Sequence, residues 1–152
     1  MATRVLGLDR LKRKLRRMPL VARDEIAKSM EQTANEVVAL AKSLTQSDRV
    51  RNSIAWTYGD APEGTFALAG VRSSDGELKI TIYAGSDDAF MARWEEFGTA
   101  PHVQGGMFAG TMHPGTPARP YFYVSWRAKR KQARSRMTRA INKAAKRVAA
   151  GG

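Results

Sequence analysis

Apolar residues recur at every third or fourth position over the first part of the chain, which is the period of an amphipathic helix. Before Pro19 they are Leu8, Leu11, Leu15 and Met18, and after it Ile26, Met30, Thr33, Val37, Ala41 and Leu44. Proline lacks a backbone donor and disfavours helical geometry in the preceding residue, so we expect a break or kink at Pro19. The pattern predicts a basic helix over residues 1–18, which could lie at the periphery of the domain, and a long helix to about Leu44.

The period then changes to two, which is typical of strands. Residues 53–59 (SIAWTYG) and 78–85 (LKITIYAG) alternate and are rich in β-branched and aromatic side chains, and residues 65–72 (TFALAGVR) form a weaker example. The sequence SSDG at 73–76 has the chemistry of a hairpin turn. Strands joined by short turns predict an antiparallel meander of three to four strands.

Two further helices follow. The segment DDAFMARWEEFG (87–98) predicts a short helix capped by Asp87 or Asp88 and ended by Gly98. Its apolar edge comprises Phe90, Trp94 and Phe97. A second apolar face marks a long C-terminal helix and comprises Phe122, Trp126, Ala133, Met137, Ile141, Ala144 and Val148. Helical spacing favours core positions for three of these side chains, namely Trp94, Phe122 and Trp126.

The predicted fold class is therefore α+β. The expected order is a long N-terminal helix, an antiparallel sheet of three to four strands, a short helix, an extended loop and a long basic C-terminal helix. A length of 152 residues favours a single domain over 1–152. No window approaches 18 apolar residues, so no contact with a membrane is expected and the chain is predicted to be soluble and unprocessed.

Charge is distributed unevenly along the chain, whose net charge is +12. The last acidic residue is Glu96, and eleven of the 26 Lys and Arg residues follow it, whereas residues 1–96 hold 15 basic and 14 acidic residues. The candidate residues of this basic C-terminal face are Arg127, Arg130, Lys131, Arg134 and Lys143. Such a face can bind nucleic acid, bind an acidic protein or simply be solvated. Nonspecific DNA binding stays an alternative, although no helix-turn-helix, zinc-finger or RNP pattern is present.

The segment from Glu95 to Phe122 (EEFGTAPHVQGGMFAGTMHPGTPARPYF) holds the candidate residues for a metal site, a phosphate-binding loop or acid–base catalysis. His102 and His113, with Glu95 or Glu96, could supply three zinc ligands, but their spacing is not a compact ligand motif. GGMFAG lacks the Lys-Ser/Thr of a phosphate-binding loop. Adjacent helical carboxylates point about 100° apart, which is poor geometry for an acid–base pair. The absence of cysteine excludes disulfides and thiolate sites. We therefore expect no catalysis, no metal and no cofactor.

The length of this segment needs another explanation. Residues 99–119 lack periodicity, and loops of about twenty residues are uncommon in compact domains unless they are functional or disordered. Met107, Phe108 and Met112 are apolar side chains that a free loop would leave in water. A neighbouring subunit could cover them, so we interpret 99–119 as an assembly loop.

Three segments carry a family resemblance: LTQSDRVRNSI (44–54), MARWEEFGTAPH (91–102) and HPGTPARPYFYVSW (113–126). In this order they resemble the neck and tail-completion proteins of long-tailed bacteriophages, the relatives of the lambda minor tail protein Z. The most specific parts are EFGT at 96–99 and ARPY at 118–121. Two departures are Ser47-Asp48, where the family often has Thr-Gly, and Tyr121, where it usually has Phe.

The resemblance implies a structural virion protein of the neck and tail, present in the host cytoplasm during assembly. It would form a homo-oligomeric ring, with a hexamer as the first expectation, beside head-connector and tail-terminator or tail-tube proteins. Glu96 and Arg119 could form an ion pair, within or between subunits, or the residues at the loop ends could merely close the domain's own core. The candidate subunit-interface residues are Glu96, Phe97, His102, Met107, Phe108, His113, Arg119, Pro120 and Tyr121.

Overall fold

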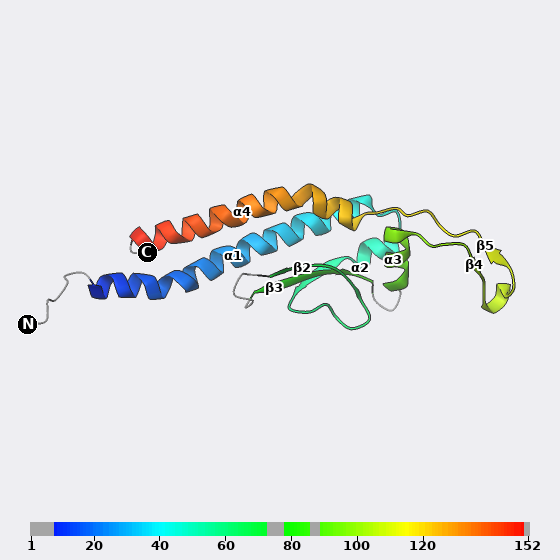
Figure 1. Ribbon diagram of the computed structural model, residues 1–152, viewed down its shortest axis with the longest axis horizontal. Coiled ribbons are helices and arrows are strands. Elements are labelled where there is room, and N and C mark those ends of the chain that lie inside the picture. Colours follow the sequence, from blue (N-terminus) through cyan, green and yellow to red (C-terminus); the bar gives the residue numbers. More distant parts are fainter. Residues whose placement is uncertain (1–7, 73–77, 86–88, 151–152) are drawn as a thin grey trace, which may run out of the picture. The chain divides into compact units, whose positions relative to one another are not determined.

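A computed structural model describes residues 8–72, 78–85 and 89–150 (Figure 1). In chain order the elements are α1 (Leu8–Leu44), α2 (Asp48–Ser53), β1 (Ala55–Tyr58), β2 (Phe66–Arg72), β3 (Lys79–Ala84), α3 (Ala89–Phe97), β4 (His102–Val103), the 3-10 turn η1 (Gly106–Phe108), β5 (Met112–His113) and α4 (Phe122–Ala150). The predicted α+β class is confirmed. No helix in these ranges is both long and apolar enough to span a membrane.

The chain divides into two compact units, and each is described by itself. Unit 1 comprises Met1–Thr33 and Arg130–Gly152, and unit 2 comprises Ala34–Lys129. The expectation of a single domain stays a prediction.

Helix α1 passes through Pro19 without interruption, so the predicted break is wrong, and the alternative of a kink stays a prediction. A proline inside a helix removes one backbone hydrogen bond and costs about 3 kcal/mol. Leucine, arginine and lysine, which are strong helix formers, dominate the segment before Pro19, and the helix continues on both sides of it. The basic segment before Pro19 is therefore, from Leu8 onward, the first part of α1.

Unit 1 is held together by an apolar stripe and a buried carboxylate. Met30 of α1 and Ala144 and Val148 of α4 are buried, at the spacing expected of amphipathic helices. Glu25 is only 7% exposed; its Oε1 accepts a hydrogen bond of 2.7 Å from Arg147 Nη1, and its Oε2 lies 3.4 Å from Lys143 Nζ. Part of the basic surface of α4 is thus used inside the unit.

The stability of unit 1 should depend on pH through Glu25. Burial by itself would raise the pKa of Glu25, but hydrogen bonds and positive charge from Lys143 and Arg147 hold it below the ordinary value of 4.5. A lowered carboxyl pKa stabilises the fold above 4.5, and this contribution disappears as pH falls through the folded-state pKa. Thermal melts should therefore show that Tm decreases less on acidification through this range for Glu25→Gln than for the wild type. Glu63→Gln, at an exposed position, is the control. An equal decrease in Tm on acidification for the wild type and Glu25→Gln would contradict the role given to Glu25.

The sheet of unit 2 has the strand order β1-β3-β2, with both pairs antiparallel. The antiparallel prediction is confirmed, but the meander is wrong because β3, not β2, is the central strand. Strand β3 has four buried residues, Ile80, Thr81, Ile82 and Ala84, and such a strand gains from a neighbour on each edge. Its register places Trp56 opposite Ile82. The predicted turn at 73–76 lies outside the described residues.

The core of unit 2 differs from the prediction at α3. The other elements contribute Val37, Ala41, Val50, Ile54, Tyr121 and Phe122, in addition to the residues of β3. Phe122 is buried as predicted, and Trp126 is half-buried. Trp94 is 50% exposed, so its predicted core position is wrong. Helix α3 instead turns Ala92 and Glu96 inward, and Trp94 packs edge-to-face on Phe90 with ring centroids 4.8 Å apart.

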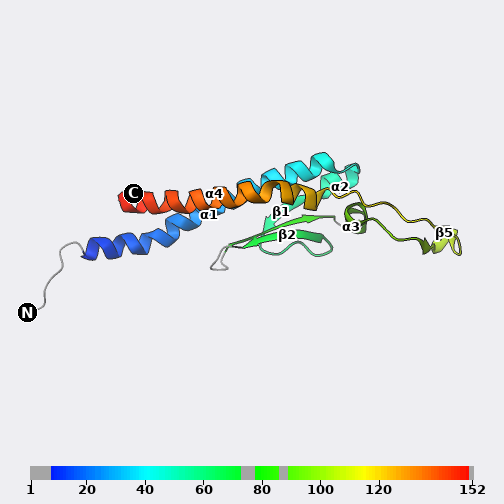
Figure 2. The ribbon, with the colours of Figure 1, turned by 45° about the horizontal axis from the view of Figure 1, so that its top comes forward.

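Helix α3 is followed by a hairpin, which we call the arm (residues 99–116). Gly98 ends α3 as predicted, with φ +71° and its N–H bonded to Trp94 O at 2.7 Å. The arm contains β4 paired with β5, the turn η1, and a bridge between Thr99 and Thr116. Its structure as a narrow antiparallel ribbon was not predicted, because its strands are too short to show a period. In both ribbon views the arm extends away from α3 and the sheet (Figures 1 and 2). The predicted caps Asp87 and Asp88 lie outside the described residues.

Candidate functional site

Glu96 anchors the start of α4. Its Oε2 accepts hydrogen bonds from the backbone N–H groups of Tyr121 (2.8 Å) and Phe122 (2.9 Å), and its Oε1 accepts one from Tyr123 (3.1 Å). The first N–H groups of a helix have no partner within the helix, and a negative charge is favourable at that end of the helix dipole. Glu96 is only 3% exposed, so it supplies acceptors where water has little access.

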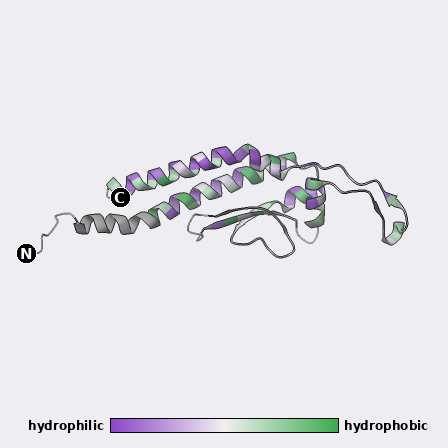
Figure 3. Ribbon diagram, in the orientation of Figure 1, coloured by the Kyte–Doolittle hydropathy of each residue, from purple (hydrophilic) through white to green (hydrophobic). Residues whose placement is uncertain are grey.

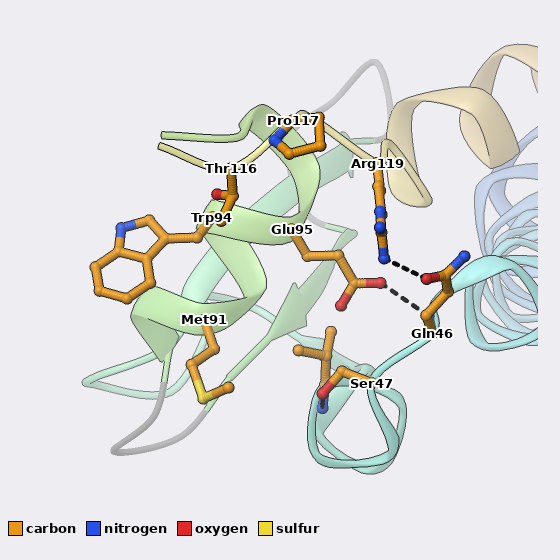
Figure 4. Close-up of a pocket in the computed structure, with 9 residues that line it drawn as sticks. Gln46, Ser47, Met91, Trp94, Glu95, Thr116, Pro117 and Arg119 are labelled. Carbon is orange, nitrogen blue, oxygen red and sulfur yellow. Dashed lines mark hydrogen bonds between the residues drawn. The ribbon is translucent and has the colours of Figure 1, made fainter. Parts of the chain in front are cut away.

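Glu95 anchors a different segment. Its Oε1 accepts hydrogen bonds from Thr45 Oγ1 (2.5 Å) and Gln46 N (2.9 Å), which lie in the connection between α1 and α2. Its backbone carbonyl accepts the N–H of Arg119 at 2.7 Å, and the Arg119 guanidinium donates to Gln46 Oε1 (Figure 4). The two neighbouring carboxylates point in different directions and are therefore a poor acid–base pair. For the same reason, they can bind two separate parts of unit 2.

Within one chain, Glu96 and Arg119 therefore contact other groups rather than each other. Tyr121 is fully buried, and its hydroxyl donates to Ala92 O at 3.2 Å. Burial, with the nearby charges of Glu96 and Glu95, raises the pKa of Tyr121, so the phenol stays a hydrogen-bond donor. Glu96 and Tyr121 thus close the core of their own unit. This is one of the two alternatives considered for the ends of the loop.

Other predicted interface residues at the arm's ends remain on the surface. Phe97 is 52% exposed and packs against Phe66 and Tyr123, with ring centroids 6.1 and 5.9 Å away. Pro120 and Arg119 are exposed. The two segments that carry most of the family resemblance, 96–99 and 118–121, therefore meet at the base of the arm.

Two glycines allow the two backbone segments at this base to approach each other closely. Gly98 has φ +71°, and a Cβ there would lie 2.5 Å from Thr116 O; Gly115 has φ +83°, and its Cβ would lie 2.3 Å from Thr99 O. Both conformations favour glycine, and both approaches are to backbone atoms. Thr99 and Thr116 exchange two backbone hydrogen bonds, of 2.9 and 3.1 Å, between these segments. The base of the arm is therefore closely packed.

The two histidines face each other across the arm. Their Cα positions are partners in the β4–β5 pair, and their rings stack with centroids 5.0 Å apart. His102 Nδ1 lies 3.0 Å from Ala100 O, and His113 Nδ1 accepts the N–H of Gly115 at 2.9 Å. In the part of the chain that the structure describes, no three His, Cys, Asp or Glu residues are grouped as a metal site would require. The geometry of the pair is that of a ribbon-stabilising contact.

The far end of the arm presents apolar side chains to solvent. Met107 is 93% exposed, Phe108 61%, Met112 67% and Val103 62%. Figure 3 shows this end of the arm, around η1 and β5, coloured as hydrophobic. We call Met107 and Phe108, both in η1, the tip. Exposed apolar side chains gathered on one element are typical of interaction sites. The structure thus brings together Met107, Phe108 and Met112 on one hairpin.

A cavity of about 530 Å³, which sequence reasoning missed, lies beside the base of the arm. Figure 4 shows Met91, Trp94 and Glu95 projecting from α3, with Gln46 and Ser47 opposite them. The wall is completed by Val50, Thr116, Pro117 and Arg119. These residues come from three separate segments, 46–50, 91–95 and 116–119, so no local pattern could have identified them together. Among them, Arg119 was predicted as an interface residue, and the spacing of Trp94 assigned it to the core.

The candidate basic face on α4 comprises five residues. Arg127, Arg130, Lys131 and Arg134 are exposed. Lys143 also lies 3.4 Å from Glu25 within unit 1, and its side chain stays 66% exposed. All five candidate residues are therefore on the surface.

Comparison with known proteins matched the chain to a family of phage proteins. The family model described as "Bacteriophage HK97-gp10, putative tail-component" matches residues 9–98, which is more than half of the chain. The matched stretch ends at Gly98, the last residue before the arm. No curated protein and no solved structure matched the chain.

Proposed function

This chain belongs to the HK97-gp10-like family of bacteriophage tail components, and we propose that it is a structural subunit of the head–tail joint. A tail component acts in the virion and interacts with other phage structural proteins. The finer proposal is an oligomeric ring, with six copies as the first expectation, between the head connector and the tail-terminator or tail-tube proteins. The ring would assemble in the host cytoplasm.

The arm is the observation that supports a ring most directly. It carries an exposed apolar end, and its base is held by the Thr99–Thr116 bridge and by close contacts at Gly98 and Gly115. An apolar surface on an anchored projection loses little conformational freedom when a partner covers it. Each copy has one arm, so a repeated contact can use the arm once per subunit.

A role without catalysis and without a cofactor fits the same site. Glu95 and Glu96 were the best candidates for acid–base chemistry, and both accept hydrogen bonds from structural groups. Occupied in this way, they hold the fold rather than a substrate. This use of the two carboxylates supports a scaffold protein.

The proposal predicts that the tip is needed for assembly but not for folding. In the double variant Met107→Ser/Phe108→Ser, each subunit contact should weaken about tenfold or more, because apolar area stays in water. Native mass spectrometry should show the loss of rings, and circular dichroism should show an unchanged fold because both side chains are exposed. Leu20→Ser, which removes an exposed apolar side chain from α1, is the matched control and should still form rings. Rings that persist in the double variant would contradict the role of the arm.

Nucleic-acid binding is the second candidate, and the exposed Arg130, Lys131 and Arg134 favour it. Phosphate contacts release counterions, so such binding falls steeply as salt concentration rises. Native mass spectrometry with random-sequence DNA at low and high salt separates the two functions. A monomer that binds DNA tightly at low salt and never forms rings would favour this second candidate.

A further inference from the structure

We propose that the tip of the arm of one copy binds in the cavity at the arm base of the next copy. This inference rests on the proposed ring and names the contact between its subunits. The tip is Met107 and Phe108, and the apolar part of the cavity wall comprises Val50, Met91 and Trp94.

Charge favours a second copy of this chain as the occupant. Residues 97–118 contain no Asp, Glu, Lys or Arg and form the longest such stretch in a chain of net charge +12. Two copies with this charge repel each other wherever their basic surfaces approach. Contact through the uncharged arm avoids placing like charges together. An acidic partner would instead be expected to use the basic side chains of α4.

The chemistry of the cavity matches that of the tip. Trp94 is 50% exposed at the wall, so its ring offers a surface for the Phe108 ring in an edge-to-face or offset arrangement. The Met107 side chain is flexible and polarizable, and it fits irregular apolar surfaces. Arg119, at the edge of the cavity, can donate to backbone carbonyls of the tip. An aromatic anchor beside an arginine is a common composition of binding hot spots.

The tip does not fill the cavity of its own chain. The arm leaves α3 at its base and extends away from it in both views (Figures 1 and 2). The cavity is lined by α3 and by Thr116 and Pro117 at the base, whereas the tip lies in η1, at the turn of the hairpin. Each copy therefore carries one tip and one cavity. A head-to-tail contact of this kind generates a closed ring when the rotation between copies closes, whereas a tip-to-tip contact would stop at a dimer.

A mixing experiment tests the contact with two variants of the full chain. Phe108→Glu disables the tip and leaves the cavity intact, whereas Trp94→Glu disables the cavity and leaves the tip intact. Each variant alone should lose rings, since burial of one aromatic side chain strengthens a contact about ten- to hundredfold. An equimolar mixture should form dimers and nothing larger, because only one intact tip–cavity contact can form per pair. Native mass spectrometry reads the result.

A separate control tests whether the two variants fold. Both substituted side chains are at least half exposed, and circular dichroism should show native helix content. If Trp94→Glu fails to fold, Trp94→Ala replaces it in the mixture. Leu20→Ser should form rings when alone. Combined in one chain with Phe108→Glu or Trp94→Glu, it should not restore ring formation.

The outcomes distinguish this contact from the proposed function. If the wild type forms rings and Trp94→Glu also forms them, the cavity is not used and the inference is overturned, while the ring remains. Loss of rings in both variants with no dimer in their mixture also overturns it. A wild-type chain that stays monomeric, alone and with tail-tube protein, contradicts the proposed function itself.

Discussion

Replacing Glu96 with alanine is expected to destabilise unit 2 by about 3–5 kcal/mol, the largest effect of any single substitution considered for this protein. The substitution removes the acceptor of three backbone N–H groups, at Tyr121, Phe122 and Tyr123. Tyr121 and Phe122 are fully buried, so water cannot readily replace the lost carboxylate. Because total stabilities of domains are about 5–15 kcal/mol, a loss of this size should leave part of the population unfolded.

Urea unfolding measures this effect. Glu96→Gln should fall between the wild type and Glu96→Ala, because an amide keeps one acceptor oxygen but turns its NH₂ group toward backbone donors. Glu63→Ala removes an exposed carboxylate and should shift stability by less than about 0.5 kcal/mol. A midpoint for Glu96→Ala equal to that of Glu63→Ala would mean that the cap on α4 contributes nothing.

The second large effect is expected at Gly98. A Cβ at this position would lie 2.5 Å from Thr116 O and 2.7 Å from Ala118 N, and the residue has φ +71°. Both neighbours are backbone atoms and cannot rotate away, so Gly98→Ala combines a left-handed conformation with a steric clash. We expect a cost of about 2–4 kcal/mol.

Gly105→Ala is the matched control in the same hairpin. Gly105 has φ −105°, and no heavy atom lies within 4 Å of its ideal Cβ, so the same change should be nearly neutral. Hydrogen exchange gives the local measurement: the N–H groups of Thr99 and Thr116, which bridge the arm, should exchange faster in Gly98→Ala only. Unchanged exchange in Gly98→Ala would show that the base of the arm accommodates the added Cβ without loss of stability.

The periodic parts of the fold were predictable because their burial repeats at short range. Helices α1 and α4 and the three strands of the sheet were expected near their observed positions. The order of the strands was not predictable, because the choice of β3 as centre depends on how buried it becomes after the chain has folded. The break expected at Pro19 is absent because one lost hydrogen bond competes with the helix propensity of a whole segment.

The candidate site was predictable in its residues but not in their contacts. Two alternatives were considered for Glu96: an ion pair with Arg119, since opposite charges stand at the two ends of the loop, or closure of the domain's own core. The actual partners of Glu96 are backbone N–H groups, which exist at every position and leave no signal in the sequence. The exposure of Trp94 was missed because a helical spacing shows which side chains share a face but not which face turns inward.

Because the base of the arm is closed, the arm can change during evolution independently of the helices on either side of it. The Thr99–Thr116 bridge and the Glu96 cap hold the two ends of the hairpin at fixed positions, whatever chain lies between them. Extra residues between such ends cost little, because loop-closure entropy grows only slowly with length. The sequence of the arm, from Pro101 to Pro114, can therefore diverge or lengthen while α3 and α4 stay in place. Changes within this one segment could therefore alter the contact proposed for the arm and leave the rest of unit 2 unchanged.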